Sequence, residues 1–319
     1  NGNAAVRPAT DVWHGLKNRE GHPLCEGGNR RPNKRKGCKM KQYRCGLIAR
    51  DIHNSITPSV YEVYARDIGM EIDFSLFNIE PEQLKGQVDF CRAHLDGFNV
   101  TMPYKQKLLE FVDEADDSAL KCGSTNTVLV REGRLIAYNT DGWGLMKALE
   151  LFGVAIEGKR VVMLGAGGVA LSIAYQLGLH GVKQVSVVNL FLDQAQSLCE
   201  RFGQRFAPVP YTAEDLCRCC RDADLFINAS VVGQVGYDDF VSLEFLKELR
   251  PGAAVYDVNY SNPDARLVPA ARALGLPAWI GKPMNACQGV RAFEIWFGRT
   301  PSDHCVRELI DRLQSGTTV

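Results

Sequence analysis

The chain lacks a net charge and an uninterrupted apolar run of membrane-spanning length. Its 319 residues contain 37 Lys and Arg against 37 Asp and Glu, which excludes the strongly basic composition typical of nucleic-acid-binding domains. One charge-free run, residues 161–179, reaches 19 residues, but Gly165, Gly167 and Gly168 interrupt it, and we predict no membrane span. With 45% hydrophobic residues, the chain is long enough for two globular domains.

Cysteine is present but without a pattern. The count of 11 is odd, and no disulfide-like spacing is found in a chain that can bury its own core, so we predict a reducing, cytoplasmic setting. The cluster of Cys217, Cys219 and Cys220 lacks a second pair at zinc-ribbon spacing, and Cys25 with Cys38 is no better. We interpret these as buried or incidental thiols and predict no metal site.

The charges are unevenly distributed along the chain. Residues 1–44 hold 11 Lys and Arg against three Asp and Glu, while the remaining 275 residues hold 26 against 34, a net charge of minus eight. We interpret the basic run at residues 30–36, "RRPNKRK", as part of a solvated, poorly ordered extension without the apolar stretch of a secretory signal. The alternative is a nucleic-acid or targeting patch; we expect no nucleic-acid partner.

After residue 44, short apolar strands alternate with amphipathic helices. Strands are predicted at residues 44–49, 72–79 and 97–102, helices at 55–69, 81–95 and 104–116, and a hairpin at 126–140 with Gly133 at its turn. This series predicts an α/β domain with helices on both faces of its sheet.

The second half repeats the alternation with more continuous apolar strands. Strand-forming runs begin near residue 160 and recur at 184–190, 224–230 and 253–260, with helices after the first and near 192–203. Such runs are typical of a parallel sheet covered on both faces. The pattern predicts a doubly wound, Rossmann-like dinucleotide-binding domain.

A glycine turn joins the first of these strands to its helix. Gly165, Ala166, Gly167 and Gly168 would let a pyrophosphate approach the backbone at the helix N-terminus; Ala170 stands at the third glycine of the fingerprint. The next strand ends in "NLF" (residues 189–191), with neither a carboxylate for the adenosine ribose nor an arginine for a 2′-phosphate. NAD or NADP is therefore expected, with NAD favoured. Asp193 could serve the ribose or simply begin the next helix.

Polar residues recur at or near the strand ends of the first half, in "NSITPS", "NVTMPYK", "GSTNTV" and "YNTDGWG". Taken singly, each is explained by a turn or a solvated helix start. Their recurrence at the strand ends of one α/β domain, where ligands collect, predicts a site for a small oxygen-rich acid. Lys105 and Asp141 supply a charged acid/base pair there.

The chain resembles the shikimate/quinate dehydrogenase family from about Cys45 to its C-terminus. Several family motifs occur in order: "SITP", "NVTMPYK", "STNTV", "NTDGWG", "GAGG", "NAS" and "MNACQG". The resemblance implies hydride transfer between NAD(P) and shikimate, with quinate as a second substrate. It also implies a substrate domain at residues 45–144 and 283–319, and a dinucleotide domain at 145–282 that holds the cofactor in the cleft between them.

The resemblance also assigns residues to roles. It implies Lys105 and Asp141 as the catalytic pair, and around the substrate Ser55, Thr57, Thr101, Asn126, Tyr260 and Gln288. Around the dinucleotide we expect Gly165, Ala166, Gly167, Gly168, Asn189, Asn228 and Gly281. We expect Lys105 to transfer the proton and Asp141 to orient Lys105. We expect Ser55 and Thr57 to hold the substrate carboxylate.

Three residues depart from the commoner family pattern. Thr57 stands where strict shikimate enzymes have serine, as in the quinate-accepting branch; Leu190 replaces the arginine of NADP-linked members; and Ser230 replaces a threonine along the nicotinamide wall. The sequence does not decide between shikimate, quinate and an amino analogue as the substrate. A homodimer is a possible oligomeric state. The rival hypothesis is a catalytically silent homologue that senses a dinucleotide or a quinate-like metabolite.

Overall fold

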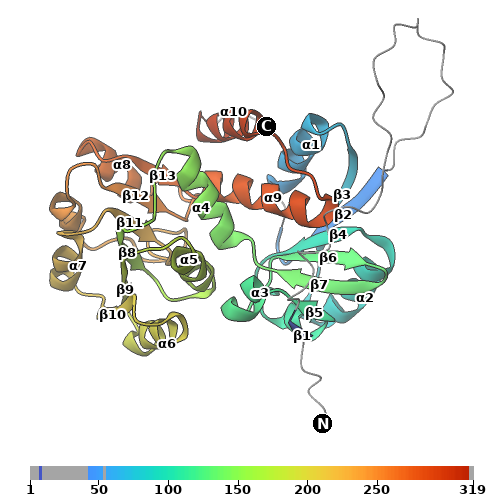
Figure 1. The fold of residues 1–319 in the computed structure, drawn as a ribbon, viewed down its shortest axis with the longest axis horizontal. Helices are drawn as coiled ribbons and strands as arrows, with labels where there is room; N and C mark the ends of the chain where they lie inside the picture. The colour runs from blue at the N-terminus through green and yellow to red at the C-terminus, as the bar shows by residue number, and fades with distance from the viewer. Residues whose placement is uncertain (1–6, 9–41, 53–54, 316–319) are drawn as a thin grey trace, which may run out of the picture.

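The computed structural model describes residues 7–8, 42–52 and 55–315. The basic run at residues 30–36, Cys25, Cys38 and most of the predicted extension at 1–44 lie outside the described residues. Two β-sheets lie side by side, each flanked by helices, and helix α4 (Asp141–Leu151) stands between them (Figure 1). This arrangement confirms the predicted two-part α/β architecture.

The first sheet has seven strands in the order β1-β5-β7-β6-β4-β2-β3. Their bounds are β1 Arg7–Pro8, β2 Gln42–Ala49, β3 Glu71–Asn78, β4 Gly97–Val100, β5 Glu114–Ala115, β6 Thr127–Arg131 and β7 Arg134–Tyr138. β6 runs antiparallel to both β4 and β7, while the other neighbours are parallel. The predicted hairpin is confirmed, since Glu132 and Gly133 both have positive φ, as its tight turn requires.

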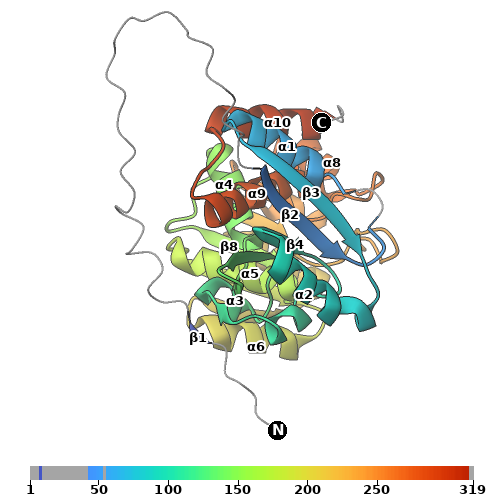
Figure 2. The ribbon, with the colours of Figure 1, turned by 90° about the vertical axis from the view of Figure 1, so that its right-hand side faces the viewer.

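Helices cover both faces of this sheet. They are α1 Thr57–Asp67, α2 Leu84–His94, α3 Asp117–Cys122, α9 Lys282–Phe297 and α10 Asp303–Ser315, with short 3-10 helices η1 Pro81–Gln83 and η2 Lys107–Glu110. Neighbouring strand residues point to opposite layers: Val128 packs in the core with α2, whereas Leu129 packs in the core with α1 and α9. Core residues therefore lie on both faces of the sheet, although the edge strand β3, in front in Figure 2, has no buried residue.

The helix predicted at residues 104–116 is wrong. Lys105 lies in a turn, only η2 forms within the segment, and the chain then joins the sheet as β5. The backbone N–H of Asp113 donates to the carbonyl of Leu135, and that of Asp116 to Ala137, both at 2.9 Å. Because these N–H groups donate to carbonyls of β7, they are not available for helical hydrogen bonds. Tertiary pairing thus overrides local helix propensity.

The second sheet is wholly parallel, in the order β10-β9-β8-β11-β12-β13. Its strands are β8 Arg160–Leu164, β9 Gln184–Asn189, β10 Phe206–Pro210, β11 Leu225–Asn228, β12 Ala254–Asp257 and β13 Ala278–Ile280. In chain order this is the 3-2-1-4-5-6 arrangement of a Rossmann fold, whose switch point lies between β8 and β11. The short strands β10 and β13 were not predicted; β10 contains Pro208 and Pro210, which an edge strand tolerates.

Five helical segments cover this sheet: α5 Gly168–Leu179, α6 Leu192–Phe202, α7 Ala213–Cys220, η3 Glu244–Glu248 and α8 Leu267–Ala273. Ile173 of α5 and Leu198 of α6 pack in one core, whereas Leu216 of α7 and Val268 of α8 pack in another on the opposite face. The two-sided covering agrees with the continuous apolar strands of the sequence.

Two glycines let α4 join the halves of the molecule. A Cβ on Gly142 would lie 2.1 Å from the carbonyl oxygen of Ser172 in α5, and one on Gly144 would lie 2.6 Å from that of Met284 in α9. Glycine is thus required for the close approach of three helices (Figure 1). The proposed domain division at residue 144 falls within α4, which packs on both halves.

The C-terminal helices return to the first sheet, as proposed from the family pattern. Trp296 of α9 donates its indole N–H to the carbonyl of Val128 at 2.9 Å, and Ser302 bonds to Asp67 at the end of α1. Within residues 7–8, 42–52 and 55–315, no helix is long and apolar enough to cross a bilayer. Cys217 and Cys219 are half-buried and Cys220 is buried, all as free thiols.

Candidate active site

A cavity of about 240 Å³ opens at the end of β4, beside the start of α1. Its lining includes seven of the eight residues predicted for catalysis and substrate binding: Ser55, Thr57, Thr101, Lys105, Asn126, Tyr260 and Gln288. The eighth, Asp141, lies directly behind the lining and contacts Lys105 and Asn126. The structure thus brings together side chains that are far apart in sequence.

Lys105 and Asp141 form an ion pair at one wall of the cavity. The Lys105 Nζ lies 2.7 Å from Asp141 Oδ2, and the two side chains are 26% and 8% exposed. Lys105 reaches the cavity from the turn after β4, and Asp141 is the first residue of α4, where the helix N-terminus favours a negative charge. The ammonium group faces the cavity while the carboxylate is held behind it, as an acid/base group and its orienting partner require.

Asn126 connects this pair to the rest of the pocket. Its Nδ2 donates to Asp141 Oδ1 at 2.8 Å and to Gln288 Oε1 at 3.1 Å, while its Oδ1 accepts from the backbone N–H of Thr140 at 2.8 Å. The side chain is buried, so these bonds fix its orientation. Asn126 therefore holds Asp141 in place and orients Gln288 of α9 at the cavity.

Two hydroxyls in the cavity lining lie next to each other. Ser55 donates to Thr57 Oγ1 at 3.0 Å, and Ser55 Oγ accepts from the Thr57 backbone N–H. Thr57 begins α1, followed by Pro58. The pair presents hydroxyl groups beside a helix N-terminus, a combination suited to a carboxylate.

Tyr260 comes to the cavity from the loop after β12. Its hydroxyl accepts from Asn285 Nδ2 at 3.4 Å. Desolvation within the pocket, together with the Asp141 charge, raises the pKa of Tyr260, so its hydroxyl stays protonated at neutral pH. Tyr260 is therefore available as a hydrogen-bond donor.

Asn99 and Tyr61 also line the cavity but were not predicted. Tyr61 donates to Asn99 Oδ1 at 2.7 Å, and Asn99 Nδ2 donates to the carbonyl of Asn126 and to Thr127 Oγ1, both at 3.0 Å. Asn99 stands in the same short motif as Thr101 and Lys105, and Tyr61 is one helical turn after Thr57. Those positions were the available signals.

The predicted glycine turn lies at the switch point of the second sheet. Gly165 has a φ of +113°, and a Cβ there would lie 2.6 Å from the carbonyl oxygen of Ala229, so this position requires glycine. A Cβ on Gly167 or Gly168 would meet open space. Glycine at those two positions is not required by packing, and the open backbone before α5 fits a pyrophosphate. Ala166, between Gly165 and Gly167, is half-buried.

Asn228, at the end of β11, is fully buried and holds together the loops beside the glycine turn. Its Nδ2 donates to Asp257 Oδ1 at 3.0 Å and to the carbonyl of Val232 at 2.9 Å, and its Oδ1 accepts from Ser230 Oγ at 2.6 Å. Burial raises the pKa of Asp257 to about 7. Gly281, also predicted here, packs where a Cβ would lie 2.0 Å from the carbonyl oxygen of Val258.

The end of β9 carries exposed apolar side chains. Asn189 donates to the carbonyl of Phe191 at 2.9 Å and to Gln194 Oε1 at 3.2 Å, which closes the turn into α6. Leu190 is 70% exposed and Phe191 59%. A dinucleotide bound at this turn would therefore meet the Asn189 amide and the apolar side chains of Leu190 and Phe191, and no cation from these three residues.

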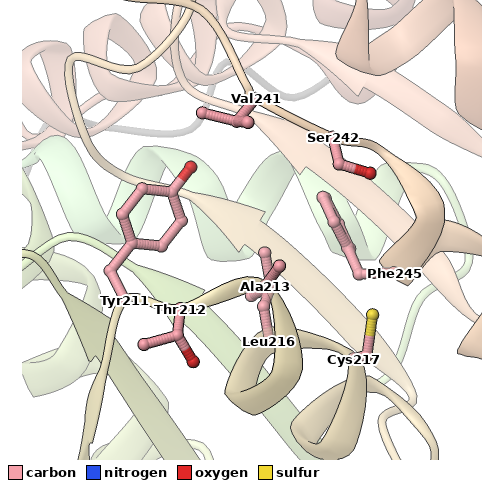
Figure 3. Close-up of a pocket in the computed structure, with 8 residues that line it drawn as sticks. All are labelled: Tyr211, Thr212, Ala213, Leu216, Cys217, Val241, Ser242 and Phe245. Carbon is pink, nitrogen blue, oxygen red and sulfur yellow. The ribbon is translucent and has the colours of Figure 1, made fainter.

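A second cavity, of about 180 Å³, lies on the other side of the dinucleotide domain, between α7 and the loop before η3 (Figure 3). Its walls are mainly apolar: Tyr211, Leu216, Cys217, Val241 and Phe245. It shares no residue with the glycine turn or with the first cavity, which we call the acid pocket.

A Rossmann sheet with an open glycine turn, joined to a pocket that holds a Lys-Asp pair, defines a two-domain, NAD(P)-linked dehydrogenase. Residues 47–128 match the family model of the shikimate dehydrogenase substrate-binding domain, and residues 147–234 match that of shikimate / quinate 5-dehydrogenase. The chain belongs to the shikimate/quinate dehydrogenase family.

Two of the relatives below are named as shikimate dehydrogenases, and a third, similar in fold, is named for another activity. The shikimate dehydrogenase (NADP+) of Citrifermentans bemidjiense is 35% identical over 272 residues, 83% of this chain and 93% of that protein. Shikimate 5-dehydrogenase from Listeria monocytogenes, solved with shikimate and NAD, is 30% identical with a TM-score of 0.77, covering 87% of this chain and all of that one. The 5-ketofructose reductase of a Gluconobacter strain is 27% identical, with a TM-score of 0.75 over 86% of this chain and 99% of that one.

Proposed function

We propose that the protein interconverts shikimate and 3-dehydroshikimate by hydride exchange with a nicotinamide dinucleotide. The observation that carries this proposal is the Lys105-Asp141 ion pair at 2.7 Å, held by Asn126 in a cavity that also presents Ser55 and Thr57. An acid/base pair and a pair of hydroxyls beside a helix N-terminus, in one cavity, match a ring that bears a reacting hydroxyl and a carboxylate.

Proton transfer is assigned to Lys105. In the reduction direction, the Lys105 ammonium gives a proton to the ketone oxygen as hydride reaches the carbon; in oxidation, the amine takes the hydroxyl proton. Bound nicotinamide supplies the hydride donor or acceptor. Asp141 holds Lys105 at the cavity wall, and the fixed Asn126 keeps Asp141 from rotating away.

Binding of the substrate carboxylate is assigned to the hydroxyl pair at the start of α1. Ser55 and Thr57 hold the carboxylate through their hydroxyls, which supply position more than charge. Thr101, Asn126, Tyr260 and Gln288 surround the ring hydroxyls. Quinate is the second candidate substrate, because Thr57 supplies the threonine of the quinate-accepting branch; the extra methyl group offers only modest discrimination.

We further propose that NAD is preferred over NADP. Leu190 and Phe191 expose apolar surface at the end of β9, where a 2′-phosphate would need a cation. The relative solved with shikimate and NAD supports this choice, whereas relatives named for NADP+ support the other. Gly167 and Gly168 would hold the pyrophosphate, while Asn228 and Gly281 shape the wall beside the nicotinamide.

The test is a set of initial rates with shikimate and with quinate, each with NAD and with NADP. We expect NAD reduction by shikimate, with kcat/KM at least about tenfold higher than with NADP, as loss of a charge-assisted contact implies. A folded protein that binds the dinucleotide but reduces neither form with either acid would instead support the sensor hypothesis. A homodimer and a cytoplasmic location stay predictions.

A further inference from the structure

We propose that Ser172, in the dinucleotide domain, is a positioning residue for Asp141 and links the glycine-turn helix to the catalytic pair. The inference rests on the proposed function and extends it to a residue outside both ligand sites. Ser172 lies in α5, four residues after Gly168, where that helix begins beside the glycine turn.

The Ser172 hydroxyl bonds on both sides of Asp141. It accepts from the backbone N–H of Gly142 at 2.7 Å and donates to Asn139 Oδ1 at 2.8 Å. The same Asn139 Oδ1 accepts from the backbone N–H of Asp141 at 3.2 Å. Ser172 is 1% exposed and Asn139 4%, so water does not replace these bonds.

Ser172 caps the Gly142 N–H at the start of α4, while Asn139, just before that helix, caps the Asp141 N–H. The first N–H groups of any helix lack partners within it, and Thr140, at the N-cap of α4, makes no side-chain cap bond. The acceptor for Gly142 comes instead from a helix 30 residues further along the chain, in the other half of the molecule. The first turn of α4, which carries Asp141, is therefore anchored to α5.

Close backbone packing makes this link stiff. A Cβ on Gly142 would lie 2.1 Å from the carbonyl oxygen of Ser172, so the two helices meet at van der Waals contact. The position of α5 therefore fixes the start of α4, which carries Asp141, the partner of Lys105. Ser172 sets where the acid/base pair stands relative to the cofactor.

The experiment compares Ser172→Ala with native enzyme and with Thr212→Ala. Thr212 caps α7 in the same domain by accepting from the Asp215 N–H at 3.0 Å, far from Asp141 along the chain, and serves as the control for lost stability. We expect Ser172→Ala to lower kcat about tenfold, as a sub-ångström misplacement implies, with KM for the dinucleotide within about threefold. Thr212→Ala should lower Tm similarly and leave kcat unchanged.

A second variant approaches the same network from α4. Asn139→Ala should also lower kcat, and the double variant Ser172→Ala/Asn139→Ala should lose no more than about threefold beyond the worse single variant, because both act through one network. Native-like kcat in Ser172→Ala, or equal kcat losses in Ser172→Ala and Thr212→Ala, would overturn the inference. Absence of shikimate oxidation in the native enzyme would instead overturn the proposed function.

Discussion

The ion pair of Lys105 and Asp141 is the most informative target for mutation. Lys105→Met removes the proton-transfer group with little change in length, and loss of a general acid/base lowers kcat by about 10² to 10⁴, or about 3 to 5.5 kcal/mol in activation free energy. Asp141→Asn keeps the shape and an oxygen for Asn126 Nδ2, which lies 2.8 Å away, but removes the charge that holds Lys105.

The double variant should be no worse than the worse single variant by more than about tenfold, because the two side chains act as a unit. For stability we expect the double variant to be better than a single variant: it should unfold at a higher temperature than Lys105→Met. Lys105→Met leaves a carboxylate that is 8% exposed with its cation removed. Breaking a buried pair costs about 3 to 5 kcal/mol, and we expect about 2 to 3 here because Lys105 is partly solvated. Lys105→Met/Asp141→Asn should therefore unfold at a higher temperature than Lys105→Met.

The assays are initial rates of dinucleotide reduction by shikimate, at saturating concentrations of both substrates, and calorimetric Tm, for the native protein, the two single variants, the double variant and Lys105→Arg. Lys105→Arg serves as the matched control for charge, because it keeps the cation next to Asp141 but is a poor proton carrier. Lys105→Arg should have a Tm close to that of the native protein and a much lower kcat. If the kcat losses of the two single variants multiplied in the double variant, Lys105 and Asp141 would act independently and the reasoning would be refuted.

Three further predictions concern the substrate carboxylate, the cofactor and pH. Ser55→Ala should raise KM for shikimate by about tenfold with kcat within about threefold, since a hydrogen bond to a charged group is lost; the reverse pattern would contradict its role. Leu190→Arg should raise the NADP/NAD ratio of kcat/KM by at least about tenfold, with Leu190→Met as control. Burial raises the pKa of Asp257 from 3.8 to about 7, so the folded protein keeps a proton that the unfolded chain loses between these values. Stability should fall by up to about 4 kcal/mol as pH rises from 4 to 8, measured as Tm, and Asp257→Asn should lack this fall.

Local patterns predicted the elements whose sequence signal is strong. The charge-free run with Gly165, Gly167 and Gly168 predicted β8, the turn and α5, and continuous apolar runs predicted the parallel strands β9, β11 and β12. Elements that depend on distant partners were missed. β5 has two residues and exists because it pairs with β7, and β10 contains two prolines in five residues.

The acid pocket was predicted from recurring polar motifs and the family resemblance rather than from spacing. Lys105 and Asp141 are 36 residues apart, and nothing between them indicates a 2.7 Å contact. Asn99 lay within a quoted motif and was still missed, because its role depends on Tyr61 of α1. Ser172 had no sequence signal, since its partners, Gly142 and Asn139, belong to the other half of the molecule.

We propose that shikimate is oxidised in the pocket where Lys105 and Asp141 meet. The most direct measurement compares NAD reduction by shikimate in the native protein and in Lys105→Met, with dinucleotide binding measured separately in both. We expect turnover in the native protein and a loss of at least about 100-fold in Lys105→Met, with dinucleotide affinity unchanged. Turnover retained in Lys105→Met, or absent from the native protein with both NAD and NADP, would contradict it.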